Sequence, residues 1–197
     1  MGITTVTNEK ITKLQYGAKG FRNAFYILYN SIMSKGGCES WDQDGDGMSV
    51  LGTSGCFAVE LYLKFLMVIE SFDATTLSGT HPKVHSLDLL YDYLKNQNVN
   101  FVNDLELEYS KSQYKSTNTN LKDFLKGIRD YFIDWRYSYD SGVLNVNLNT
   151  LSDVLNILED YSIKKFLGVA EELAKHPVSN PDEQTMTISN FDDVKKL

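Results

Sequence analysis

Apolar residues recur at steps of three and four along most of the chain, which is the spacing of one helix face. The first such stretch runs from about Thr7 to Ser34, and a denser one covers residues 56–72. The denser stretch is apolar on nearly all sides, so we expect it at the centre of the fold. Between the two, residues 35–55 are rich in glycine and aspartate and predict a long loop.

The pattern continues in shorter pieces through the middle of the chain. Residues 73–85 contain breakers and predict a connector. Ser86 is a good N-cap for a third helix that ends near Gln97. Residues 101–114 allow a fourth helix, and helical spacing returns over residues 121–139.

The last apolar stripe predicts a helix from Thr150 to about Lys175, with Asp153 in a capping-box-like position. Residues 141–149 before it alternate, so they form either an extended connector or a short strand. We therefore predict an all-α fold, a single bundle of five or six helices over residues 1–175. A polar tail, residues 176–197, follows it.

Composition narrows the class of protein. The 197 residues are 42% apolar and 23% charged, as in a single soluble globular domain. The net charge of −7 argues against binding along a nucleic-acid duplex, which needs clustered basic residues. The start lacks the apolar region of a signal peptide, and no long uncharged apolar run predicts a membrane span. Cys38 and Cys56 are expected to be free thiols in the cytoplasm.

One acidic segment resembles half of a calcium-binding loop. Asp42, Asp44, Asp46 and Gly47 match positions 1, 3, 5 and 6 of an EF-hand. Thr53 stands at position 12, where a glutamate should complete the ligand shell. We interpret the segment as an acidic loop between helices, with a calcium site as the alternative.

Two histidines four residues apart, His81 and His85, do not predict a metal site. Pro82 disfavours a helix through His81, and no acidic or cysteine cluster supplies a third ligand. His85 directly precedes Ser86, so a capping or orienting role at the helix entrance is expected. We expect no metal and no cofactor.

Glu60 and Lys64 are charged residues in a stretch that is otherwise almost wholly apolar. They are spaced i,i+4 with the glutamate first, the favourable order for an ion pair. One interpretation is a simple pair at the helix edge. The other has Glu60 meeting Arg136 across helices in a polar cluster.

Taken in order, four segments of the chain resemble the HEPN domain family. These are residues 21–32, 58–67, 85–94 and 135–140. The resemblance implies a helical bundle from a prokaryotic toxin–antitoxin or defence system, acting as a homodimer. It also implies a nucleotidyltransferase or another defence-system protein as partner.

Ribonucleases of that family use an arginine followed four to six residues later by a histidine. Arg136 matches the arginine, but Ser141, Gly142 and Val143 stand where the histidine belongs. An arginine can stabilise phosphate charge, whereas proton transfer needs a group that titrates near neutral pH. The phenols of Tyr137 and Tyr139 ordinarily titrate near 10 and do not replace it.

We therefore expect a non-catalytic binding or regulatory module with a groove for a nucleotide, RNA, a phosphate group or a protein partner. The expected binding residues are Arg136, Tyr137, Tyr139, Glu60, Lys64 and His85. One alternative is a divergent metal-independent endoribonuclease that uses Arg136 and His85. Another is a structural dimerisation protein whose polar cluster is an internal staple.

Overall fold

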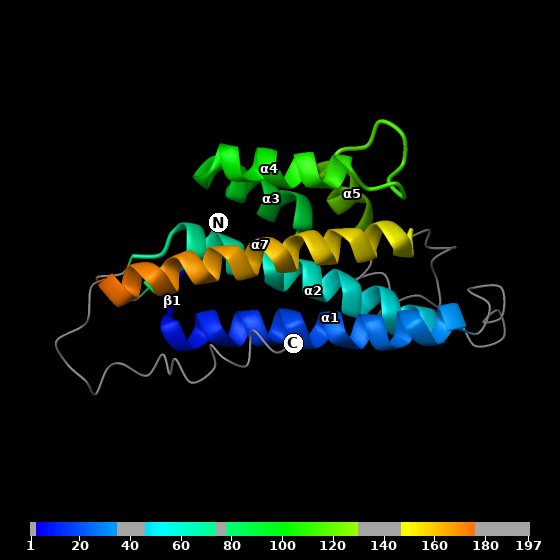
Figure 1. Ribbon diagram of the computed structural model, residues 1–197, viewed down its shortest axis with the longest axis horizontal. Helices are drawn as coiled ribbons and strands as arrows, with labels where there is room; N and C mark the ends of the chain where they lie inside the picture. Colours follow the sequence, from blue (N-terminus) through cyan, green and yellow to red (C-terminus); the bar gives the residue numbers. More distant parts are fainter. Residues whose placement is uncertain (1–2, 35–45, 74–77, 130–146, 176–197) are drawn as a thin grey trace.

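The computed structural model describes residues 3–34, 46–73, 78–129 and 147–175, and six helices lie within them (Figure 1). The prediction of an all-α helical bundle is confirmed. The helices are α1 (Asn8–Ser34), α2 (Asp46–Glu70), α3 (Leu87–Gln97), α4 (Val99–Ser110), α5 (Leu121–Ile128) and α7 (Leu148–Lys175).

Helix α2 is the centre of the bundle. It packs against α1, α7 and α3, and α3 in turn carries α4 and α5 (Figure 1). Every residue from Tyr62 to Ile69 is buried, so this part of α2 is enclosed on all sides. The expectation that the densest apolar stretch lies at the centre is confirmed, because such a helix must bury its whole circumference.

Residues Val50–Glu70 of α2 are also long and apolar enough to cross a membrane, with a mean hydropathy of 1.4. In this fold 83% of that stretch is buried against other helices. Length and composition do not distinguish a span from the core helix of a soluble protein, so this is weak evidence for a membrane.

Helix α2 begins at Asp46, ten residues before the predicted start, so the loop prediction for residues 46–55 is wrong. Leu51 is fully buried, and Gly55 is buried as well. A Cβ atom at Gly55 would lie 2.7 Å from Leu151 Cδ2 and 2.9 Å from Phe25 Cδ2. Close packing therefore explains a glycine that local propensity marks as a helix breaker.

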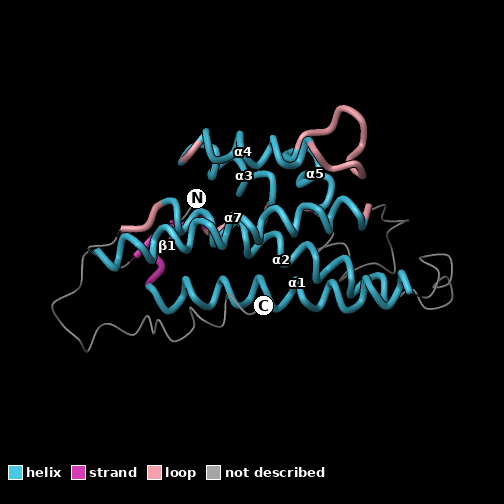
Figure 2. Tube along the Cα trace, in the orientation of Figure 1, coloured by secondary structure: helices cyan, strands magenta, loops and turns pink. Residues whose placement is uncertain are grey.

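The described residues also form two short strands that the sequence did not predict. Strand β1 (Ile3–Thr7) pairs antiparallel with β2 (Ser78–Pro82), with Ile3 opposite Pro82 and Thr7 opposite Ser78. Figure 2 shows them together beside the start of α1. A Cβ at Gly79 would lie 2.3 Å from the carbonyl oxygen of Val68, so β2 runs directly over α2. Residues 78–82 are thus a strand inside the predicted connector.

The predicted capping box of the last helix is wrong. Helix α7 begins at Leu148, and the Asn147 side chain accepts hydrogen bonds from the backbone of Asn149 and Thr150, each at 3.1 Å. The Thr150 hydroxyl instead donates to the carbonyl of Tyr114 at 2.7 Å. The hydrogen bond of Thr150 to the distant Tyr114 thus replaces the predicted capping bond within the helix.

Helix α3 follows Ser86 as predicted, but the Ser86 hydroxyl donates to the Asp88 side chain and does not cap the helix backbone. Helix α4 is the predicted fourth helix. The predicted continuation of α5 to residue 139, residues 141–146 and the tail, 176–197, lie outside the described residues.

Replacing Gly55 by alanine should destabilise the fold by about 2 kcal/mol, because the new methyl group overpacks a buried contact. Gly20 is the matched control: it is exposed in the middle of α1, with nothing within 4 Å of its Cβ position. Gly20→Ala should stabilise by about 1 kcal/mol through helix propensity. Urea denaturation measures both, and equal effects would contradict the packing described for Gly55.

Burial raises the pKa of the Cys56 thiol to about 12, and the residue is 2% exposed. Since the thiolate is the reactive form, Cys56 should resist thiol reagents in the folded protein. In a Cys38→Ser chain, dithionitrobenzoate at pH 8 should label the remaining thiol only after denaturant is added. Complete labelling within minutes in native buffer would show that Cys56 is accessible.

Candidate functional site

Glu60, Lys64 and His85 form a compact polar cluster, called here the Glu60 cluster. The ammonium of Lys64 lies 2.6 Å from Glu60 Oε1, and the two side chains are only 10% and 6% exposed. The Nδ1 atom of His85 lies 2.9 Å from the same oxygen. The predicted i,i+4 ion pair between Glu60 and Lys64 forms, but it is buried rather than at the helix edge. Within the described residues, the group from another segment that contacts Glu60 is His85.

Burying a carboxylate and an ammonium costs free energy unless each is paired and hydrogen-bonded. Glu60 meets this condition twice, through Lys64 and through His85. The position follows from the fold, because the segment from β2 to α3 brings His85 over the outer end of the Glu60 side chain.

The side chain of His85 is 77% exposed, although one ring nitrogen is bonded to a buried group. A carboxylate accepts hydrogen bonds, so Nδ1 is the protonated nitrogen that donates to Glu60. The other nitrogen, Nε2, is then presented to solvent by a ring of fixed orientation. This is how a carboxylate orients an imidazole that binds or exchanges protons at its far side.

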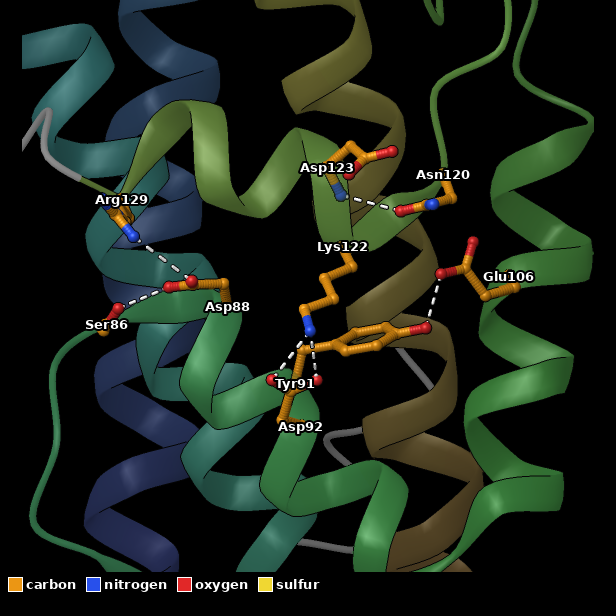
Figure 3. A network of polar contacts seen from close by, with 9 residues as sticks. All are labelled: Ser86, Asp88, Tyr91, Asp92, Glu106, Asn120, Lys122, Asp123 and Arg129. Carbon is orange, nitrogen blue, oxygen red and sulfur yellow. Dashed lines mark hydrogen bonds and ion pairs between the residues drawn. The ribbon is translucent and has the colours of Figure 1, made fainter.

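A second basic side chain, Arg129, is held by a carboxylate at the same end of α3 (Figure 3). The hydroxyl of Ser86 donates to Asp88 Oδ1 at 2.5 Å, and Asp88 Oδ2 lies 3.3 Å from Arg129 Nη1. The Asp88 side chain is 13% exposed and that of Arg129 is 37% exposed. Burial alone would raise the pKa of Asp88, but the hydrogen bond from Ser86 and the charge of Arg129 lower it below its ordinary value.

Further polar contacts join α3, α4 and α5, the last of which ends directly before Arg129 (Figure 3). Lys122 of α5 pairs with Asp92 of α3 at 2.7 Å. Glu106 of α4 accepts from the Tyr91 hydroxyl at 2.5 Å and from the backbone of Leu121 at 2.9 Å. These bonds tie α3, α4 and α5 together, so the start of α3 and the end of α5 keep a fixed relation.

The structure brings three of the six expected site residues together, namely Glu60, Lys64 and His85. Arg136, Tyr137 and Tyr139 lie outside the described residues.

Arg129 and Asp88 were not expected from the sequence to belong to the site. The sequence did show Ser86 and Asp88 together at a helix start. The ion pair of Asp88 with Arg129, however, joins residues 41 positions apart, and no sequence periodicity indicates such a contact.

Metal binding gains no support from the described residues, which contain no group of three or more histidine, cysteine or acidic side chains suited to an ion. Asp46 begins α2, while Asp42 and Asp44 lie outside the described part. His81 and His85 have different partners: His81 Nδ1 lies 2.9 Å from the carbonyl of Pro82, whereas His85 is bonded to Glu60.

The fold and the site define an all-α bundle in which two basic side chains, His85 and Arg129, are each held by a carboxylate where α3 begins. No family model, curated protein or solved structure matches the chain. What the protein does must therefore follow from the chemistry of its own side chains.

We predict that Asp88→Asn lowers the free energy of unfolding at pH 7 by about 1 kcal/mol, since it removes a partly exposed ion pair. The pKa of Asp88 is lowered in the folded state, so the stabilisation is complete above the unfolded pKa of about 3.9. It is lost as the pH falls through the folded pKa.

Urea denaturation at pH 7, 5 and 3 measures this difference, which should shrink towards acid. Asp104→Asn, at an exposed position of α4, is the control. A difference for Asp88→Asn that stays constant across this range would contradict the ionic role.

Proposed function

We propose that the protein is a HEPN-like binding or regulatory module that recognises a phosphate group of RNA or a nucleotide at the start of α3. The order of the resembling segments supports this: residues 21–32 lie in α1, 58–67 in α2, and 85–94 at the start of α3. The fourth segment, 135–140, lies outside the described residues.

The observation that carries the proposal is the exposed imidazole of His85 on the buried Glu60–Lys64 pair. An internal staple needs only the two buried charges, and a third, exposed group adds little to it. A fixed ring with a free nitrogen instead suits an outside ligand. Ser86, the residue after His85, is bonded to Asp88, and Asp88 pairs with the guanidinium of Arg129. Guanidinium groups match phosphate oxygens in geometry and charge.

Arg136 follows Arg129 by seven residues in the sequence. In our proposal Arg136 adds a further cation, while Tyr137 and Tyr139 offer rings on which bases stack. A few local cations on a chain of net charge −7 favour a short ligand over a long duplex. The proposal includes a cytoplasmic homodimer, with a nucleotidyltransferase or another defence protein as partner.

One observation favours a second candidate, a metal-independent endoribonuclease. A buried carboxylate that orients an imidazole is the arrangement of a general base, and Glu60 and His85 have it at 2.9 Å. In this function His85 removes the proton of a ribose 2′-hydroxyl, and Arg136 stabilises the charge on the phosphate.

Fluorescence anisotropy with a fluorescein-labelled ten-nucleotide single-stranded RNA tests the proposal, with adenosine monophosphate as competitor. His85→Gln and Arg129→Gln should each weaken binding about tenfold, the loss expected for one charge-assisted hydrogen bond. Lys126→Gln is the matched control, since it removes an exposed charge from the same helix as Arg129 without touching the site. Unchanged binding by His85→Gln would contradict the proposal.

The same RNA, incubated in EDTA and analysed by electrophoresis, separates the two candidates. A binding module leaves it intact. Cleavage that disappears in His85→Gln but persists in Lys126→Gln establishes the nuclease.

Thermal and urea denaturation test the remaining alternative, a structural dimer. Glu60→Gln should cost about 3 kcal/mol, because it leaves a buried ammonium without its counter-charge. His85→Gln should cost little, since its ring is mostly exposed. A large loss in both variants, with no RNA binding by the wild type, would favour the structural role.

A further inference from the structure

The sheet formed by β1 and β2 is closed on the β2 side by its own chain. The Ser71 hydroxyl accepts from the backbone N–H of Thr80 at 2.7 Å and lies 3.0 Å from the carbonyl oxygen of the same residue. Further along this edge, Asp73 and Ser78 exchange two backbone hydrogen bonds, at 2.8 and 3.4 Å. The outer edge of β2 therefore has its main-chain partners within the protein.

These contacts also fix the direction of the main-chain groups of β1. In an antiparallel ladder, the N–H and C=O of one residue point to the same side, and the side alternates along the strand. Thr80 turns both groups away from β1, so its register partner Thr5 turns both away from β2. The same holds for Ser78 and its partner Thr7. By alternation Ile3 faces outward with them, so these three residues form the outer edge of β1.

This outer edge has none of the features that prevent pairing with another strand. Within the described residues the sheet consists of β1 and β2, and no third strand lies beside β1 (Figure 2). Unpaired edges are normally protected by lysine, proline or a bulge. Strand β1 contains neither residue, and its register with β2 is continuous. All five of its residues are β-branched, which favours strand pairing.

The distribution of charge favours a second copy of this chain as the occupant of the edge. Because the net charge is −7, two copies repel each other over much of their surface. Residues 1–8, however, contain no charged side chain, and β2 contains no acidic residue. Two copies can therefore approach along β1 without like charges meeting, whereas an acidic or basic peptide would find no opposite charge on this strand.

The register of β1 also allows the strand to pair with itself. A two-fold axis at Thr5 places this residue opposite its own copy, and it places Ile3 opposite Thr7 of the second copy. All of these residues face outward, so each pair can exchange both of its main-chain hydrogen bonds. Such an interface is isologous and closed, as in most homodimers.

We propose that β1 strands of two copies pair antiparallel about Thr5 and join the two sheets into one sheet of four strands. The proposal rests on the homodimer of the proposed function, for which it supplies the interface, and it does not depend on the RNA site.

Sedimentation velocity of the full chain, from micromolar to sub-millimolar concentration, tests the interface. Thr5→Pro should weaken dimerisation about tenfold, the effect of two main-chain hydrogen bonds lost across the axis. The N–H that proline removes faces away from β2, so the β1–β2 pairing keeps its hydrogen bonds. Thr5→Val is the matched control: it keeps both the N–H and a β-branched side chain, and it should dimerise as the wild type does.

Hydrogen exchange of the wild-type protein gives a second readout that needs no variant. Protection of the Thr5 amide should rise with protein concentration, whereas that of the Thr4 amide, which faces β2, should stay constant. A wild type that is monomeric throughout would overturn both the homodimer and this interface. A dimer that Thr5→Pro leaves intact, or protection of Thr5 that is independent of concentration, would overturn the interface alone. RNA binding is measured separately by anisotropy, so its failure is distinguishable from either result.

Discussion

The burial of α2 on every side is the constraint on which the rest of the structure depends. Each large apolar side chain removed from water contributes about 1.5–3 kcal/mol, and α2 supplies an uninterrupted buried series from Tyr62 to Ile69. The same burial would be unfavourable for Glu60 and Lys64 if either stood alone. Their mutual pairing is therefore a condition for placing this helix at the centre.

This constraint also explains why polar chemistry gathers where α3 begins. A buried carboxylate must be satisfied, so Glu60 fixes the ring of His85, and Asp88 fixes the guanidinium of Arg129. In both cases the acid is nearly enclosed while the base remains accessible. Such pre-organisation lowers the entropy lost on binding, because the ligand meets groups that are already oriented.

The polar groups at the start of α3 differ in kind from those between α1 and α7. At the start of α3, two basic side chains are held by acids, the arrangement on which we base the proposal of a phosphate ligand. Between α1 and α7, Glu159 neutralises Arg22, and the neighbouring asparagines offer neutral donors and acceptors.

The pattern of apolar residues was enough to predict a helical bundle, the length of α1, the central place of α2 and the start of α3 directly after Ser86. These follow from the periodicity of apolar and polar residues, which acts over a few residues and can be read from the sequence alone. The pairing of Glu60 with Lys64 could also be predicted from the sequence, because a helix fixes the distance between residues four positions apart.

Only the tertiary structure decided the features that join distant segments. Helix α2 extends back to Asp46 through Gly55, which packs against Phe25 and Leu151, and local propensity does not contain these contacts. In the same way, the β1–β2 pairing, the contact of His85 with Glu60 and that of Asp88 with Arg129 depend on where the chain returns in space. Periodicity determines which face of each element is buried, whereas the partner of that face is chosen by packing among all the elements.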